Sequence, residues 1–197
     1  MANINLSGLT LIHNTPWLKV WEQTFQDKEA NWKQWSFVSR SDDPKATIDK
    51  PDAVVIVPYF VYNTKNHLIL TSEFRIPLRD YEVGFPAGLI DDGETVEEAA
   101  KRELREETGY VVKEIKKVSP SIYSSAGLTD ESVVLVFVEC FWECNKPSLE
   151  SSEDITVTVY NQDEMKHILE HPCSGALKFG AKAWPIIDRF AETGKVI

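Results

Sequence analysis

Three glutamates crowd one short stretch of this chain at a spacing suited to holding a divalent cation. Glu103 precedes Glu106 by three residues and Glu107 by four, so in a helix their side chains share one face, with Cβ atoms about 5–6 Å apart. Like charges placed in this way destabilise a bare helix, and a cation relieves the repulsion. Mg²⁺ prefers carboxylate oxygens and keeps waters that a phosphate can displace. The spacing predicts a magnesium site, whereas the competing interpretation is a merely solvated charged face.

The helix that carries these glutamates has clear start and stop signals. Thr95 is a good N-cap, and Glu98 follows it by three residues, which predicts a capping box. Gly109 is suited to end the helix as a C-cap. Arg102 precedes Glu106 by four residues, so the two side chains can pair and the arginine can orient a ligand carboxylate.

Apolar and β-branched runs around this helix predict a sheet that supports it. Strands are expected at residues 17–21, 32–38, 53–62, 67–74, 81–85, 111–118, 132–141 and 155–160, and further helices at 163–169 and 175–190. The polar segment Ser41–Pro51, with two prolines, marks a boundary. The order predicts an α/β (α+β) fold in which a mixed sheet is sandwiched between helices. We expect a small N-terminal β subdomain over residues 1–48 and a main domain over 49–197.

Composition narrows the classes of function. The 197 residues carry a formal net charge of −10, which argues against general binding to nucleic acid or to anionic membranes. The three cysteines, Cys140, Cys144 and Cys173, form an odd and sparse set, and we expect ordinary reduced thiols. The first residues resemble no signal peptide and no apolar run reaches the roughly 20 residues of a membrane span. These features predict a cytoplasmic protein.

The stretch from Gly88 to Tyr110, GLIDDGETVEEAAKRELREETGY, resembles the signature of the Nudix hydrolase superfamily at every fixed position. Gly88 is followed after five residues by Glu94 and after seven more by Arg102-Glu103-Leu104; one residue later come Glu106-Glu107-Thr108-Gly109 and Tyr110. The match covers 23 residues and is highly specific. It implies a Nudix fold and hydrolysis of a pyrophosphate bond, with Mg²⁺ as cofactor and Mn²⁺ as a possible substitute.

The lead-in Phe85-Pro86-Ala87-Gly88 is similar to that of the ADP-ribose pyrophosphatase group. This resemblance implies that the Ala87 carbonyl joins Glu103 and Glu107 as a metal ligand, with Glu106 in or near the shell. The implied reaction converts ADP-ribose to AMP and ribose 5-phosphate. Ala126 and Gly84 depart from the group's pattern near the expected pocket, which leaves GDP-mannose, another ADP-sugar or a dinucleotide as alternative substrates. A non-catalytic nucleotide-binding module is a further alternative, disfavoured by the complete set of carboxylates.

The same resemblance assigns residues outside the signature. Arg75 and Arg40 would contact the substrate phosphates, since the planar guanidinium suits a diphosphate, although either could be a plain surface charge. Trp17 and Trp35 would stack on adenine, with core filling as the alternative. Glu153 would be the general base, with Glu150 as second choice and a solvated linker as the competing interpretation. The family also implies a homodimer in which the N-terminal strands interlock, so that each site borrows residues from its partner.

Overall fold

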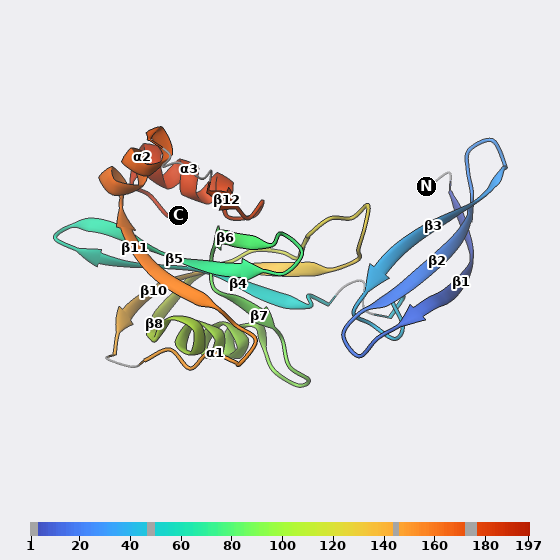
Figure 1. Ribbon diagram of the computed structural model, residues 1–197, viewed down its shortest axis with the longest axis horizontal. Coiled ribbons are helices and arrows are strands. Elements are labelled where there is room, and N and C mark those ends of the chain that lie inside the picture. Colours follow the sequence, from blue (N-terminus) through green and yellow to red (C-terminus); the bar gives the residue numbers. More distant parts are fainter. Residues whose placement is uncertain (1–3, 47–49, 144–145, 172–176) are drawn as a thin grey trace. The chain divides into compact units, whose positions relative to one another are not determined.

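The contacts of the chain divide it into two compact units. The computed structural model describes residues 4–46, 50–143, 146–171 and 177–197. One unit comprises Met1–Asp52 together with Ser121–Val133, and the other comprises Ala53–Pro120 together with Val134–Ile197. Figure 1 labels most of the elements of both units.

The N-terminal unit is built on a three-stranded antiparallel sheet. Its strands are β1 (Asn5–Asn14), β2 (Lys19–Gln26) and β3 (Trp32–Ser39), in that order. The two strands and the turn expected between residues 17 and 38 are therefore present. The sequence did not predict strand β1. Its residues are mostly exposed, and they form a strand because they pair with β2. The segment 121–133 packs on β3, where the Val38 N–H donates to the Leu128 carbonyl at 2.9 Å.

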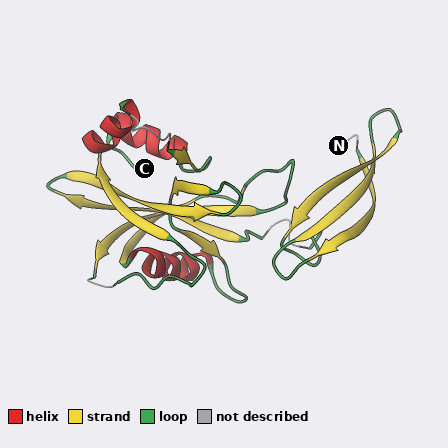
Figure 2. Ribbon diagram, in the orientation of Figure 1, coloured by secondary structure: helices red, strands yellow, loops and turns green. Residues whose placement is uncertain are grey.

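The second unit is built on a mixed sheet with helices on both faces (Figures 1 and 2). Within the described residues its strands follow the order β12-β6-β5-β4-β10-β8, while β11 pairs with β5 and β7 with β4. Strand β9 pairs with the first two residues of β10, and these four residues belong to the N-terminal unit. Strands β12 and β6 are parallel. The strands are β4 (Ala53–Tyr62), β5 (Lys65–Arg75), β6 (Asp80–Gly84), β7 (Ala87–Leu89), β8 (Tyr110–Val118), β9 (Ile122–Tyr123), β10 (Ser132–Trp142), β11 (Ile155–Asn161) and β12 (Lys178–Phe179).

Each face of this sheet has its own hydrophobic core, because side chains alternate along a strand. In β4, Val54 and Ile56 belong to the cluster that includes Leu104 of α1 (Val96–Thr108). Val57 belongs instead to the cluster with Phe190, on the side of α2 (Gln162–Glu170) and α3 (Trp184–Thr193). The expectation of a mixed sheet sandwiched between helices, with a small β sheet at the N-terminus, is confirmed.

The prediction of a helix over residues 175–190 is wrong for the first half of that range. Gly175 lies outside the described residues, and Lys178–Phe179 form strand β12 beside β6. The helix begins only at Trp184, with a proline in its first turn, a position that proline tolerates well. The Gly180 N–H donates to the Val83 carbonyl at 3.0 Å, so pairing with the sheet overrides the local helical pattern.

Two expectations from composition concern the cysteines and membranes. Cys140 is a free thiol buried in the core on the α1 side, and burial raises its pKa to about 12. Cys144 and Cys173 lie outside the described residues. In the part of the chain that the structure covers, no helix is long and apolar enough to cross a membrane.

Candidate active site

Helix α1 begins and ends where the sequence predicts. The Glu98 N–H donates to Thr95 Oγ1 at 3.2 Å, and the Glu98 carboxylate accepts from the Thr95 N–H at 2.9 Å, which completes the capping box. Gly109 closes the helix in the left-handed conformation with φ of 75°, which glycine adopts without strain. These caps fix the helix ends, so the glutamate-bearing face is held in a defined position against the sheet.

Two of the glutamates are buried between α1 and β7. Glu103 is 9 % exposed and Glu107 is 4 % exposed, although carboxylates are almost never fully buried without a partner. A Cβ at Gly88 would lie 1.9 Å from Oε1 of Glu103, so only glycine lets the strand approach the carboxylate this closely. The Ala87 N–H donates to the Glu107 carboxylate. The strand and the helix therefore share one small polar site.

The Ala87 carbonyl lies on the helix side of β7. The preceding carbonyl, of Pro86, accepts from the Ile56 N–H of β4 at 2.8 Å. Because carbonyls alternate in direction along an extended strand, that of Ala87 points away from β4. The structure thus brings the carbonyl to the same side of the strand as Glu103 and Glu107.

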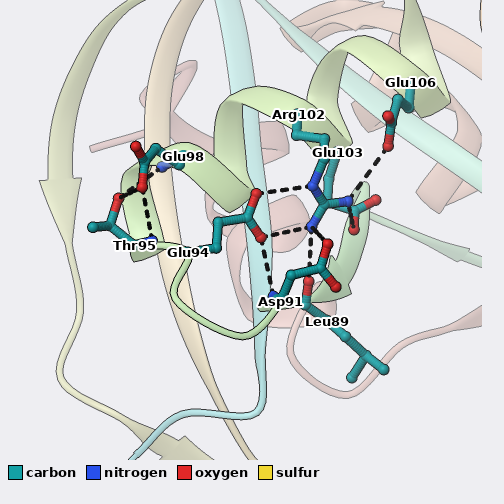
Figure 3. A network of polar contacts seen from close by, with 8 residues as sticks. All are labelled: Leu89, Asp91, Glu94, Thr95, Glu98, Arg102, Glu103 and Glu106. Atoms are coloured by element: carbon teal, nitrogen blue, oxygen red, sulfur yellow. Dashed lines mark hydrogen bonds and ion pairs between the residues drawn. The ribbon is translucent and has the colours of Figure 1, made fainter.

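Arg102 organises the rim of this site (Figure 3). It binds both carboxylate oxygens of Glu94, at 2.9 and 2.8 Å, and it contacts Glu103 at 2.6 Å and Glu106 at 3.4 Å. It also donates to the Leu89 carbonyl at 3.0 Å. The predicted pairing with Glu106 is present but is the longest of these contacts. The guanidinium therefore fixes Glu103 against the loop that carries Glu94.

Further carboxylates from the sheet face the same region. In β5, Glu73 and Arg75 follow Ile69 at even spacing, and Ile69 packs on the α1 side, so all three share that face. Burial raises the pKa of Glu107 to about 9, and the charges of Glu103, Glu73 and Glu153 add to the shift. Burial likewise raises the pKa of Glu103 and of Glu73. This concentration of buried carboxyl groups is suited to a cation, which would favour their ionised form.

Arg75 is held by two glutamates of the sheet. Its side chain contacts Glu73 at 2.6 Å and, on the neighbouring strand β6, Glu82 at 3.2 Å. Glu73 and Glu82 are register partners across β5 and β6. The arginine is therefore placed beside the carboxylate cluster with its charge balanced, and an anionic substrate could draw it away from either partner.

Glu153 lies in the loop before β11 and contributes to the same electrostatic cluster. The Glu150 N–H donates to the Glu153 carboxylate at 2.7 Å, and the Glu153 N–H donates to the Glu150 carbonyl at 3.1 Å. The Ser148 N–H donates to the carbonyl of Glu106 at 2.7 Å, which ties the loop to α1. Glu150 thus shapes the turn that carries Glu153.

Three residues predicted from the resemblance belong to the N-terminal unit. There Arg40 is ion-paired with Glu131 at 3.0 Å, and Nε1 of Trp35 donates to the Gly127 carbonyl at 3.2 Å. Trp17 precedes β2 and is 75 % exposed, so it does not fill a core. Their roles toward a substrate stay predictions.

Sequence reasoning missed Glu73 and Glu82 as members of the cluster. Glu73 is two residues from Arg75, and the period of a strand places such residues on one face, so this signal was available. The position of Glu82 depends on its register with Glu73, which local sequence does not encode.

The donor set fits a hard divalent cation. Among the described residues no group of three or more His, Cys, Asp or Glu side chains forms a ready metal cage. A Mg²⁺ site does not require three protein side chains, because Mg²⁺ binds through one or two carboxylates and keeps several waters. Two buried glutamates whose pKa values are raised by burial, with one backbone carbonyl beside them, match that preference.

The chain resembles known proteins in sequence and in fold. The family model described as NUDIX domain matches residues 50–176. An ADP-ribose pyrophosphatase of Saccharomyces cerevisiae is 32 % identical over 123 residues, which are 62 % of this chain and 52 % of that protein. An ADP-sugar pyrophosphatase of Mus musculus is 37 % identical over 133 residues, 65 % of this chain and 57 % of that protein. The ADP compounds hydrolase NudE of Escherichia coli is 47 % identical over 79 residues, 38 % of this chain and 40 % of that protein.

Each of these three alignments spans less than two thirds of the relative's own length. A crystal structure of an ADP compounds hydrolase superposes with a TM-score of 0.70 at 20 % identity, and covers 100 % of this chain and 98 % of the other. This match shows a common fold.

Proposed function

Because the chain belongs to the Nudix family, we propose that it hydrolyses the pyrophosphate bond of a nucleoside diphosphate sugar with a divalent cation, and that ADP-ribose is its substrate. The observation that carries the proposal is the pair of buried glutamates, Glu103 and Glu107, set against the backbone of Ala87 and Gly88. A buried pair of carboxylates is costly without a cation. Its position in the complete signature supports catalysis over mere nucleotide binding.

Each residue has a distinct part in the proposed reaction. Glu103, Glu107 and the Ala87 carbonyl would hold Mg²⁺, with Glu106 in or near the shell; bound there, the ion supplies charge neutralisation and makes water more acidic. Arg102 holds the Glu103 carboxylate in place. Arg75 exchanges one of its glutamate partners for a phosphate oxygen, a fork-like contact that suits a diphosphate. Glu153 accepts the proton of the attacking water.

The choice of ADP-ribose rests on the sequence lead-in and on the names of relatives. The yeast and mouse relatives are called ADP-ribose and ADP-sugar pyrophosphatases, and the bacterial relative is called an ADP compounds hydrolase. Trp17 and Trp35 would stack on the adenine and Arg40 would contact a phosphate. We also propose a homodimer, in keeping with the exposed apolar residues of the N-terminal sheet.

A substrate panel tests the proposal. ADP-ribose, ADP-glucose, GDP-mannose and a dinucleotide are incubated with Mg²⁺, with Mn²⁺ or with chelator, and the products are identified by chromatography. We expect ADP-ribose to be cleaved fastest, to AMP and ribose 5-phosphate, with little turnover in chelator. If ADP-ribose were cleaved much more slowly than another compound, the assignment of ADP-ribose as substrate would be wrong. Hydrolysis of a pyrophosphate bond would still be the reaction.

A matched pair of variants tests the metal site. Glu107→Gln should lower kcat at saturating Mg²⁺ by about 100-fold or more, since a bound metal contributes several kcal/mol to catalysis. Glu97→Gln removes an exposed carboxylate from the first turn of the same helix and should leave kcat unchanged. Near-normal turnover by Glu107→Gln would reject the assignment of Glu107 as a metal ligand. If the wild type turned over no compound of the panel, a non-catalytic nucleotide-binding module would be favoured instead.

A further inference from the structure

Glu153 and its neighbour Asp154 end the loop before β11 and make their contacts in different directions. Ile155 is the register partner of Glu73, which lies on the face of the carboxylate cluster. Glu153 shares the electrostatic cluster of Glu73, Glu103 and Glu107. Asp154 instead bonds to Tyr81, the register partner of Phe74, whose side chain points to the face opposite that of Glu73. The two neighbouring carboxylates therefore lie toward opposite faces of the sheet.

A tyrosine from another strand holds Asp154 in place. Tyr81, on β6, donates its hydroxyl hydrogen to the Asp154 carboxylate at 2.5 Å. β6 and β11 pair with opposite edges of β5 over residues 71–73, so this bond spans β5. Beneath it lies Phe74, whose ring meets that of Tyr81 edge-on at 5.4 Å and whose N–H donates to the Asp154 carbonyl at 3.1 Å.

The loop that carries Glu153 is anchored on both sides of that residue. The Ser148 N–H binds the end of α1 at one side, and the turn closed by Glu150 and Glu153 lies between. On the β11 side the described contacts are the Phe74 hydrogen bond and the Tyr81 hydroxyl. Tyr81 is 42 % exposed, so its ring buries little apolar surface. Its hydroxyl is the group that restrains the loop, through Asp154.

We propose that Tyr81 is a positioning residue, which acts through Asp154 to hold the Glu153 carboxylate toward Glu73, Glu103 and Glu107. This inference rests on the proposed hydrolase function for its catalytic consequence. The structural half of the inference is that the Tyr81 hydroxyl restrains the loop, and this half does not depend on the identity of the substrate. Tyr81 itself does not touch the reacting atoms and is not a catalytic residue.

The structural half is tested by amide hydrogen exchange in the ligand-free protein. Tyr81→Phe keeps the ring and removes the hydroxyl, so the fold should persist with the same thermal midpoint. The amides of Phe74 and Glu153 should exchange about tenfold faster, because a hydrogen bond to a charged group is lost. Tyr62→Phe is the matched control, because Tyr62 is exposed and its hydroxyl makes no hydrogen bond within the described residues. Unchanged exchange in Tyr81→Phe overturns the proposal whatever the substrate is.

The catalytic half of the proposal is tested by steady-state kinetics on the same chain. Tyr81→Phe should lower kcat about 10- to 100-fold with KM within about twofold, since a base displaced by about 1 Å loses rate on this scale. Asp154→Ala should have the same effect, and the double variant no greater one. In a Glu153→Gln background, Tyr81→Phe should have no further effect, because the group that it positions is gone.

Two outcomes contradict this half. If Tyr81→Phe lowers kcat by the same factor with and without Glu153, the tyrosine acts elsewhere. If kcat is unchanged in Tyr81→Phe while wild type is active, the link to catalysis is wrong. Failure of the wild type to cleave any compound of the panel would refute the proposed function instead, and exchange would still decide whether Tyr81 restrains the loop.

Discussion

The buried carboxyl group of Glu107 makes the stability of the metal-free protein depend on pH. Burial and neighbouring glutamates raise its pKa from 4.5 to about 9, so between these values the folded state holds a proton that the unfolded state has released. Stability then falls as pH rises, because the slope follows the difference in bound protons. Glu107→Gln removes the titration. In chelator at pH 8, Glu107→Gln should therefore unfold at a higher urea concentration than wild type.

The same pair of proteins gives its own controls. At pH 4.5 the midpoints should approach each other, since Glu107 is then protonated in the folded state and half protonated in the unfolded state. Saturating Mg²⁺ at pH 8 should stabilise wild type by mass action and leave Glu107→Gln almost unchanged. A wild type that is more stable than Glu107→Gln in chelator at pH 8 would contradict the buried, protonated state.

Gly88 sets the distance between the strand and Glu103. A Cβ there would meet the Glu103 carboxylate at 1.9 Å, a clash that moves either the side chain or β7. Gly88→Ala should lower Mg²⁺-dependent turnover about 10- to 100-fold, the range found when the support of a metal ligand is disturbed. Titration of activity against Mg²⁺ measures the effect.

Gly8→Ala is the control for Gly88→Ala, because a Cβ at Gly8 meets nothing within 4 Å. Its Mg²⁺ dependence should match that of wild type. Wild-type Mg²⁺ dependence in Gly88→Ala would show that Glu103 does not need this close approach.

At the scale of elements, the capping box fixes where α1 starts. Thr95 bonds to Glu98 in both directions, and Ala at an N-cap typically costs about 1 kcal/mol. Thr95→Ala should lower the free energy of unfolding by about that amount, measured by urea denaturation, while Thr95→Ser should keep most of it. Loss of stability in both variants alike would show that the hydroxyl is not the stabilising group.

The elements that could be predicted are those encoded locally. The caps of α1 and the β-branched runs of β4 and β10 lie within short windows of sequence, and the structure has them at the expected places. Strands β7, β9 and β12 have two or three residues, too few to show a period. They exist because a neighbouring strand offers hydrogen bonds, and β12 replaces the first half of an expected helix for this reason.

The site was predictable to the extent that it is contained in one helix. The spacing of Glu103 and Glu107 required only the period of α1. The cluster formed with Glu73 and Glu153 requires the register of β5 and β11, and the partners of Arg75 require that of β5 and β6. Those registers are set by packing on both faces of the sheet, which is a property of the whole unit.

At the scale of the whole molecule, the N-terminal sheet presents an apolar face that a second copy could cover. Leu6, Phe25, Trp35 and Phe37 line a hollow of about 380 Å³ in this unit. Leu6 is 70 % exposed, and proteins rarely leave large contiguous apolar patches in water. A symmetric dimer would place the same patch of each copy at the interface. We therefore expect a dimer at micromolar concentration in sedimentation velocity experiments.

Leu6→Glu puts a charge on that face at little cost to the isolated fold, since the side chain is already exposed. Buried in a dimer, the unpaired carboxylate should cost several kcal/mol and weaken association by about 100-fold or more, so that monomer dominates at micromolar concentration. Val61→Glu, at a 54 % exposed position in the other unit, should remain dimeric. A dimer that tolerates Leu6→Glu would place the interface on another surface, and a monomeric wild type would exclude the homodimer, because the apolar face would then be solvated in the native protein.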